Sequence, residues 1–153
     1  MRKIFILIVT AFAFSSITFA CDKTTLKPSE AFKEADIIFS GKVENLRYLD
    51  DPDQTKTDPR IIVTFSTIKV WKGTAEKTLT IHTTHNKFTC NGYVFKAGEE
   101  YLVYSHYNRR ADNILAKFFA PAKPTLGIKV YGGTKLFSKA KDDIKYLDKE
   151  VAN

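Results

Sequence analysis

The sequence predicts a mainly β protein, formed by a single domain with a helix near each end. Several short runs alternate apolar and polar side chains, which is typical of strands with one buried face. Turns and loops rich in glycine, proline, asparagine or aspartate separate these runs. The helical spacing of apolar residues appears before the first strand and after the last. This periodicity is compatible with either a small barrel or a sandwich.

A signal peptide is predicted at the N-terminus. The basic residues 2–3 precede an almost wholly apolar run over residues 4–14. Thr18 and Ala20 place small side chains three and one residues before the expected cut, so cleavage is predicted directly before Cys21. The apolar run is shorter than the roughly 20 residues that span a bilayer. The protein is therefore expected to be exported, either secreted or held in the periplasm or cell envelope.

Residues 1–20 are assigned to the signal peptide and residues 21–153 to one mature domain. Removal of Arg2 and Lys3 leaves 22 basic and 17 acidic residues, a net charge of +5. The lysines are scattered along the chain, so no nucleic-acid partner is expected. We expect a monomer without a cofactor.

The pattern predicts each element in turn. Gly41 lies inside the first expected strand and indicates a bend or bulge. In the next strand the apolar register shifts after Phe65, which predicts a β-bulge. Ser138 is expected to cap the last helix. The expected elements are a helix over 28–36, strands over 37–49, 60–71, 77–83, 100–108 and 114–119, a short extended segment over 93–95, a further short strand within 126–131, and a helix over 138–151 with Ala140, Ile144, Leu147 and Val151 on its buried face.

The mature chain has two cysteines, Cys21 and Cys90. An even number in an exported protein favours one disulfide bond. Two free thiols are the first alternative, and lipidation of Cys21 is the second. Membrane attachment is expected only in the lipidated form. Lipidation signals have a small residue two positions before the cysteine, whereas this sequence has Phe19 there, which argues against lipidation.

No catalytic centre is predicted, and the protein is not expected to be an enzyme. The sequence has no nucleophile elbow, no paired-carboxylate signature and no glycine-rich phosphate loop. His82, His85 and His106 do not have the spacing of metal ligands, and no acidic or cysteine cluster completes a set. They are therefore interpreted as surface histidines, and no metal site of the protein's own is expected.

Five segments in order resemble bacterial proteins that are similar to the tissue inhibitors of metalloproteinases. They are residues 35–43, residues 63–73 ending in Trp-Lys-Gly, the cysteine loop 90–95, residues 98–104 and residues 136–147. The resemblance implies a netrin-module OB-fold, which is a five-stranded Greek-key barrel with flanking helices.

The chain also departs from this family. Lys23 stands where family members usually have a second cysteine, and residues 129–134 lack the cysteine that usually follows the fifth strand. Among the family's bridges, only a Cys21–Cys90 disulfide remains available. The segment 120–131 has no counterpart in the family and is interpreted as an insertion.

The resemblance implies inhibition of a zinc metalloendopeptidase. The free amine and the carbonyl of Cys21 would chelate the protease zinc, with Cys90 as the anchor of that terminus. Asp22 would enter the specificity pocket, where the family usually has threonine or serine, and desolvating a carboxylate there is costly. The alternatives are an extracytoplasmic OB-fold module that binds an oligosaccharide or a protein without inhibiting it, or an envelope lipoprotein.

Overall fold

The computed structural model describes residues 26–49, 60–84, 92–107, 125–129 and 132–152. Cys21, Asp22, His85 and Cys90 lie outside this part of the chain, as does the strand expected over 114–119. The elements in chain order are α2 (Pro28–Glu34), β1 (Ile37–Tyr48), β2 (Arg60–Lys72), β3 (Thr78–Thr84), β4 (Glu100–Tyr107), β5 (Leu126–Gly127), β6 (Lys135–Leu136), the 3-10 helix η2 (Phe137–Lys139) and α4 (Lys141–Val151).

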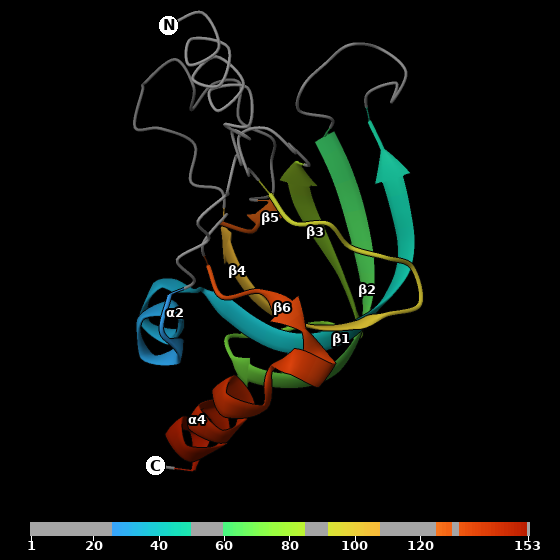
Figure 1. Ribbon diagram of the computed structural model, residues 1–153. Helices are drawn as coiled ribbons and strands as arrows, with labels where there is room; N and C mark the ends of the chain where they lie inside the picture. Colours follow the sequence, from blue (N-terminus) through green and yellow to red (C-terminus); the bar gives the residue numbers. More distant parts are fainter. Residues whose placement is uncertain (1–25, 50–59, 85–91, 108–124, 130–131, 153) are drawn as a thin grey trace, which may run out of the picture.

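Five strands close into a barrel (Figure 1). β1 pairs antiparallel with both β2 and β4, and β2 pairs antiparallel with β3. β5 closes the barrel because it pairs parallel with β3 and antiparallel with β4. The order β1-β2-β3-β5-β4 is that of an OB-like barrel, so the mainly β barrel with two helices is confirmed.

The short strand expected within 126–131 is present as β5. It contains only Leu126 and Gly127, lies in the segment interpreted as an insertion, and runs parallel to β3. Two residues, one of them glycine, are too few to produce an alternating pattern. The strand is therefore defined by its neighbours and not by its own periodicity.

Bulges let β1 and β2 coil around the barrel. Ile68 and Trp71 of β2 and Glu44 of β1 have no partner in the β1–β2 register, which confirms the bulge expected in β2. Gly41 lies at one of the register shifts, and a Cβ there would be 3.0 Å from the carbonyl oxygen of Ser66. A side chain would hold the two strands apart at this close approach, which explains the glycine.

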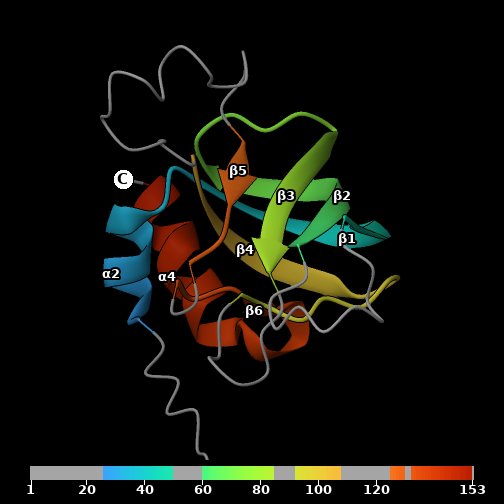
Figure 2. The ribbon, with the colours of Figure 1, turned by 90° about the horizontal axis from the view of Figure 1, so that it is seen from above.

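Two cores lie on opposite sides of the wall formed by β1 and β4. The barrel interior holds an aromatic cluster in which Phe65 meets Phe39 and Phe95 edge-to-face, with ring centroids 5.5 and 5.2 Å apart. The second core lies between the wall and the helices α2 and α4, which pack side by side (Figure 2). β4 therefore alternates between two buried faces, with Val103 in the barrel and Tyr104 against the helices.

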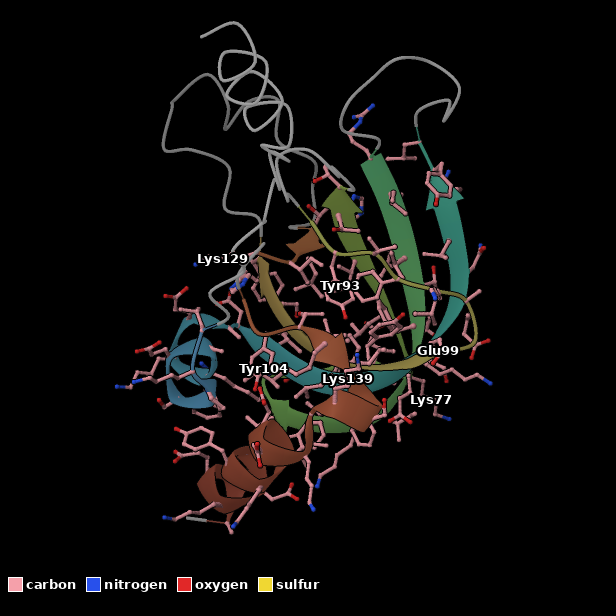
Figure 3. All side chains as sticks on the ribbon, viewed as in Figure 1. Lys77, Tyr93, Glu99, Tyr104, Lys129 and Lys139 are labelled. Carbon is pink, nitrogen blue, oxygen red and sulfur yellow. The ribbon has the colours of Figure 1, made fainter. Side chains whose placement is uncertain are left out.

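Polar contacts, one of them fully buried, fix α4 to the barrel. The Tyr104 hydroxyl donates to Asp143 at 3.1 Å, and the Lys135 ammonium donates to the other carboxylate oxygen of Asp143 at 2.8 Å (Figure 3 labels Tyr104). Trp71, carried outward by its bulge, donates its indole N–H to Asp148 at 2.6 Å. Asp143 is buried, so its two partners compensate for the loss of water.

The start of the last helix corrects the sequence interpretation. Ser138 lies inside η2 and does not cap α4, whose N-cap is Ala140 without a side-chain hydrogen bond. The 3-10 turn brings Ala140 into full burial before the α-helix begins. At the other end Val151 is 58 % exposed, because α4 extends past the second core.

Candidate functional site

The residues on either side of the expected cysteine loop lie at one end of the barrel. The chain leaves the described part after Thr84 and returns at Gly92, where φ is +79° and a Cβ would lie 1.5 Å from the Thr84 carbonyl oxygen. Next to it the Tyr93 N–H donates to the Thr83 hydroxyl at 3.4 Å. Cys90 therefore belongs to a segment whose two described ends contact each other at the end of β3.

A groove of about 240 Å³ lies at this end of the barrel, and we call it the rim groove. It forms where β1 has ended, β2 begins, β3 ends and β5 lies beside them. These strand ends lie at the upper end of the barrel in Figure 1. In OB-folds, the face of strands 2 and 3 and the loops between strands 1–2 and 4–5 bind oligonucleotides and oligosaccharides. The rim groove is lined by Leu49, Arg60, Ile61, His82, Thr83, Thr84, Gly127 and Ile128.

A smaller apolar notch of about 70 Å³ adjoins the rim groove. Its floor belongs to the barrel core, where the rings of Tyr93 and Phe95 meet at a tilt of 47° with centroids 4.8 Å apart (Figure 3 labels Tyr93). Tyr48 and Val94 also line it and are 51 % and 54 % exposed. Exposed apolar side chains of this size, gathered next to a groove, indicate a contact surface. The notch is lined by Leu46, Tyr48, Ile61, Val63, Thr83, Tyr93, Val94 and Phe95.

The structure places His82 and His106 on either side of Gly127. Both histidines pair with this glycine in the sheet register, one from β3 and the other from β4. His82 lines the rim groove, which was not predicted from the sequence. The part of the chain that the structure describes contains no group of three or more His, Cys, Asp or Glu side chains that could hold a metal ion.

His106 is held at the C-terminal end of α2. Its Nδ1 lies 3.2 Å from the Glu34 carbonyl oxygen, an acceptor, so Nδ1 carries the proton and donates. Its Nε2 is buried and has no hydrogen-bond partner among the described residues. Burial is the main cause that lowers the pKa of His106, and the nearby Lys129 lowers it further, against the opposing effects of Asp36 and Glu34.

We expect acidification to destabilise the protein through His106. Its pKa in the unfolded chain is about 6.5, so between the lower folded pKa and 6.5 the unfolded chain binds more protons. Stability should therefore fall as the pH drops from about 6.5 through the folded pKa. Thermal unfolding between pH 7.5 and 5.5 measures this, and His106→Gln should flatten the profile while the control His82→Gln retains it. An unchanged slope in His106→Gln would contradict the assignment.

A third, wide groove of about 570 Å³ lies beside α2 and was not anticipated from the sequence. The Lys129 ammonium donates a hydrogen bond to the Glu34 carboxylate at 2.9 Å (Figure 3 labels Lys129). This hydrogen bond is the main cause that lowers the pKa of Glu34, and the positive charge of Lys129 lowers it further. Asp36 accepts from the Tyr107 N–H at 2.9 Å. The contacts join the C-terminal end of α2 and the residues just after it to the end of β4 and to Lys129, just after β5.

Within the described ranges, no helix has the length and apolar character needed to cross a membrane.

No family model matches the chain, and no curated protein matches it. The resemblance to the tissue inhibitors of metalloproteinases therefore depends on the five segments of the sequence alone.

Proposed function

We propose that the protein is exported and inhibits a zinc metalloendopeptidase through the N-terminal Cys21 of the mature chain. The observation that supports the proposal is the placement of Thr84 and Gly92. These residues flank the Cys90 segment at the end of the barrel that carries both the rim groove and the exposed apolar side chains Tyr48 and Val94. A protease could thus contact a broad, partly apolar surface next to the zinc-binding terminus.

The chemistry requires an unmodified terminus. A catalytic zinc keeps one coordination position open for water, and an amine with its adjacent carbonyl forms a five-membered chelate that displaces this water. An α-amino group has a pKa of about 7.7–8, which leaves a useful neutral fraction near pH 7. In the proposal a Cys21–Cys90 disulfide anchors the terminus, so that little conformational entropy is lost on binding. Asp22 would then face the specificity pocket.

The test compares the mature protein starting at Cys21 with a form that carries one additional alanine before it. Inhibition of a panel of zinc endopeptidases by the native form is expected, together with its loss in the extended form, because the chelating amine is displaced. The extended protein also controls for folding, since the barrel is unchanged. Equal inhibition by both forms would refute chelation by Cys21.

A second candidate function is the binding of an oligosaccharide at the rim groove. The observation in its favour is the position of this groove, which matches the surface that OB-folds use for such ligands. Arg60, His82 and Thr84 supply polar groups there. If neither form of the protein inhibits any zinc endopeptidase, this candidate becomes the leading one.

A further inference from the structure

We infer that the C-terminal half of β1 accepts an extended strand from a protein partner. This inference deepens the proposed function because it specifies how the partner docks. It rests on the proposed function in one respect, namely that the partner is a protein. The feature that carries the inference is a stretch of β1 in which one edge pairs with β2 and the other edge has no strand partner in the described part of the chain.

The first half of β1 is paired on both edges. Residues 37–42 pair with β4, and residues 38–42 pair with β2 as well. The next contact on the β4 side is Val43, whose N–H donates to Glu99 at 2.9 Å and whose carbonyl accepts from Gly98 at 2.8 Å. After the bulge at Glu44, β1 pairs with β2 alone.

The backbone groups beyond the bulge point alternately to the two edges. The Leu49 N–H donates to the Arg60 carbonyl at 2.9 Å, so Leu49 faces β2. Because alternate residues of an antiparallel strand face the same edge, Arg47 also faces β2, whereas Leu46 and Tyr48 face away. Within the described residues, no backbone group bonds to Leu46 or Tyr48 on that side. We call these two residues the open edge.

The open edge combines two N–H groups and two carbonyls, none of which has a backbone partner on that side among the described residues, with an apolar notch. Leu46 and Tyr48 themselves line the notch, together with Val94 and Phe95. In strand addition, the backbone hydrogen bonds supply affinity and pockets for alternate side chains supply selectivity. Natural proteins usually protect an edge with charges or proline, and neither open-edge residue is of these types. The occupant is therefore an extended peptide segment with an apolar side chain for the notch.

The first test is hydrogen exchange of the mature protein without a ligand. The amides of Leu46 and Tyr48 are expected to exchange roughly tenfold or more faster than those of Arg47 and Leu49, which face β2. Comparable protection of all four amides would show that another segment of this chain already covers the edge, and it would overturn the inference.

The second test uses an N-acetylated, C-amidated Thr-Val-Thr-Val-Thr peptide, with binding followed by NMR of the β1 amides. The control peptide has the same side chains but N-methyl groups on alternate residues, which remove the hydrogen-bond donors of one edge. Loss of two or more backbone bonds should weaken binding about tenfold or more. Equal binding of both peptides, or no shift of the β1 amides at millimolar peptide, would contradict strand addition.

Two variants at Tyr48 separate the backbone from the side chain. Tyr48→Ala keeps the open N–H, whereas Tyr48→Pro removes it without removing a bond to β2, since proline is tolerated on the free side of an edge strand. Peptide binding should be about two- to tenfold weaker in Tyr48→Pro than in Tyr48→Ala. If Tyr48→Pro does not fold, the two peptides still decide the question.

The outcomes distinguish this inference from the proposed function. Inhibition of a protease that is equal in Tyr48→Pro and Tyr48→Ala would overturn strand addition but leave zinc chelation intact. Peptide binding at the open edge by a protein that inhibits no protease would support strand addition and contradict the inhibitor proposal.

Discussion

Gly92→Ala is expected to detach the segment after Cys90 from the barrel and to lower the free energy of unfolding by about 2–4 kcal/mol. The new Cβ would lie 1.5 Å from the Thr84 carbonyl oxygen, a distance that no relaxation of side chains can relieve. The backbone must therefore move away from β3, and the bond from the Tyr93 N–H to Thr83 would be lost with it. Urea unfolding of the mature protein measures the change.

Gly98→Ala is the matched control for this prediction. Gly98 has a φ of +82°, almost the same as Gly92, but a Cβ there meets no atom within 4 Å. The control should therefore lose only the cost of a left-handed conformation, about 1–2 kcal/mol. Equal losses from the two variants would show that the close contact with Thr84 contributes nothing.

Phe65→Ala is expected to lower the free energy of unfolding by about 3–5 kcal/mol. Phe65 is fully buried at the centre of the barrel and contacts Phe39 and Phe95 edge-to-face, so its removal leaves a cavity bounded by strands on several sides. Because domains are stable by only about 5–15 kcal/mol, a large part of the total stability would be lost. Calorimetry or urea unfolding gives the value.

Ile68→Ala provides the control on the same strand. Ile68 is 60 % exposed because it is an unpaired residue of the β2 bulge, so its truncation should cost about 0.5 kcal/mol or less. Similar losses from Phe65→Ala and Ile68→Ala would contradict the arrangement of the barrel core and of the bulge.

The sequence predicted the long strands well because each has at least one buried face with a period of two. The start of β2 and the alternation of Leu79 and Ile81 in β3 were both expected, and β4 was recognised from its continuous apolar run. That run exists because β4 is covered by the barrel interior on one side and by α2 and α4 on the other. The strand therefore has no polar face.

The sequence was less informative where structure depends on distant neighbours. A short strand was expected within 126–131, but its two-residue extent and its closing role depend on the hydrogen bonds that β3 and β4 offer to β5. Ser138 suggested a cap, but full burial of Ala140 determines where α4 begins.

The candidate site was predicted only in part. The rim groove gathers residues from β2, β3 and the region of β5, and no local signal joins Arg60 to His82 or Gly127. The contribution of Cys21, Asp22 and Cys90 remains a prediction, because all three lie outside the described residues. Only the ends of the Cys90 segment, at Thr84 and Gly92, connect that prediction to the structure.

The two ends of the barrel have different roles. At one end short turns connect the strands, such as the turn at Gly73 between β2 and β3. At the other end Leu49 and Thr84 line the rim groove, and neither belongs to the barrel core or to the second core. Substitutions at these two positions therefore leave the side chains of both cores intact. A lineage or a protein engineer could thus alter what the molecule recognises while inheriting its scaffold unchanged.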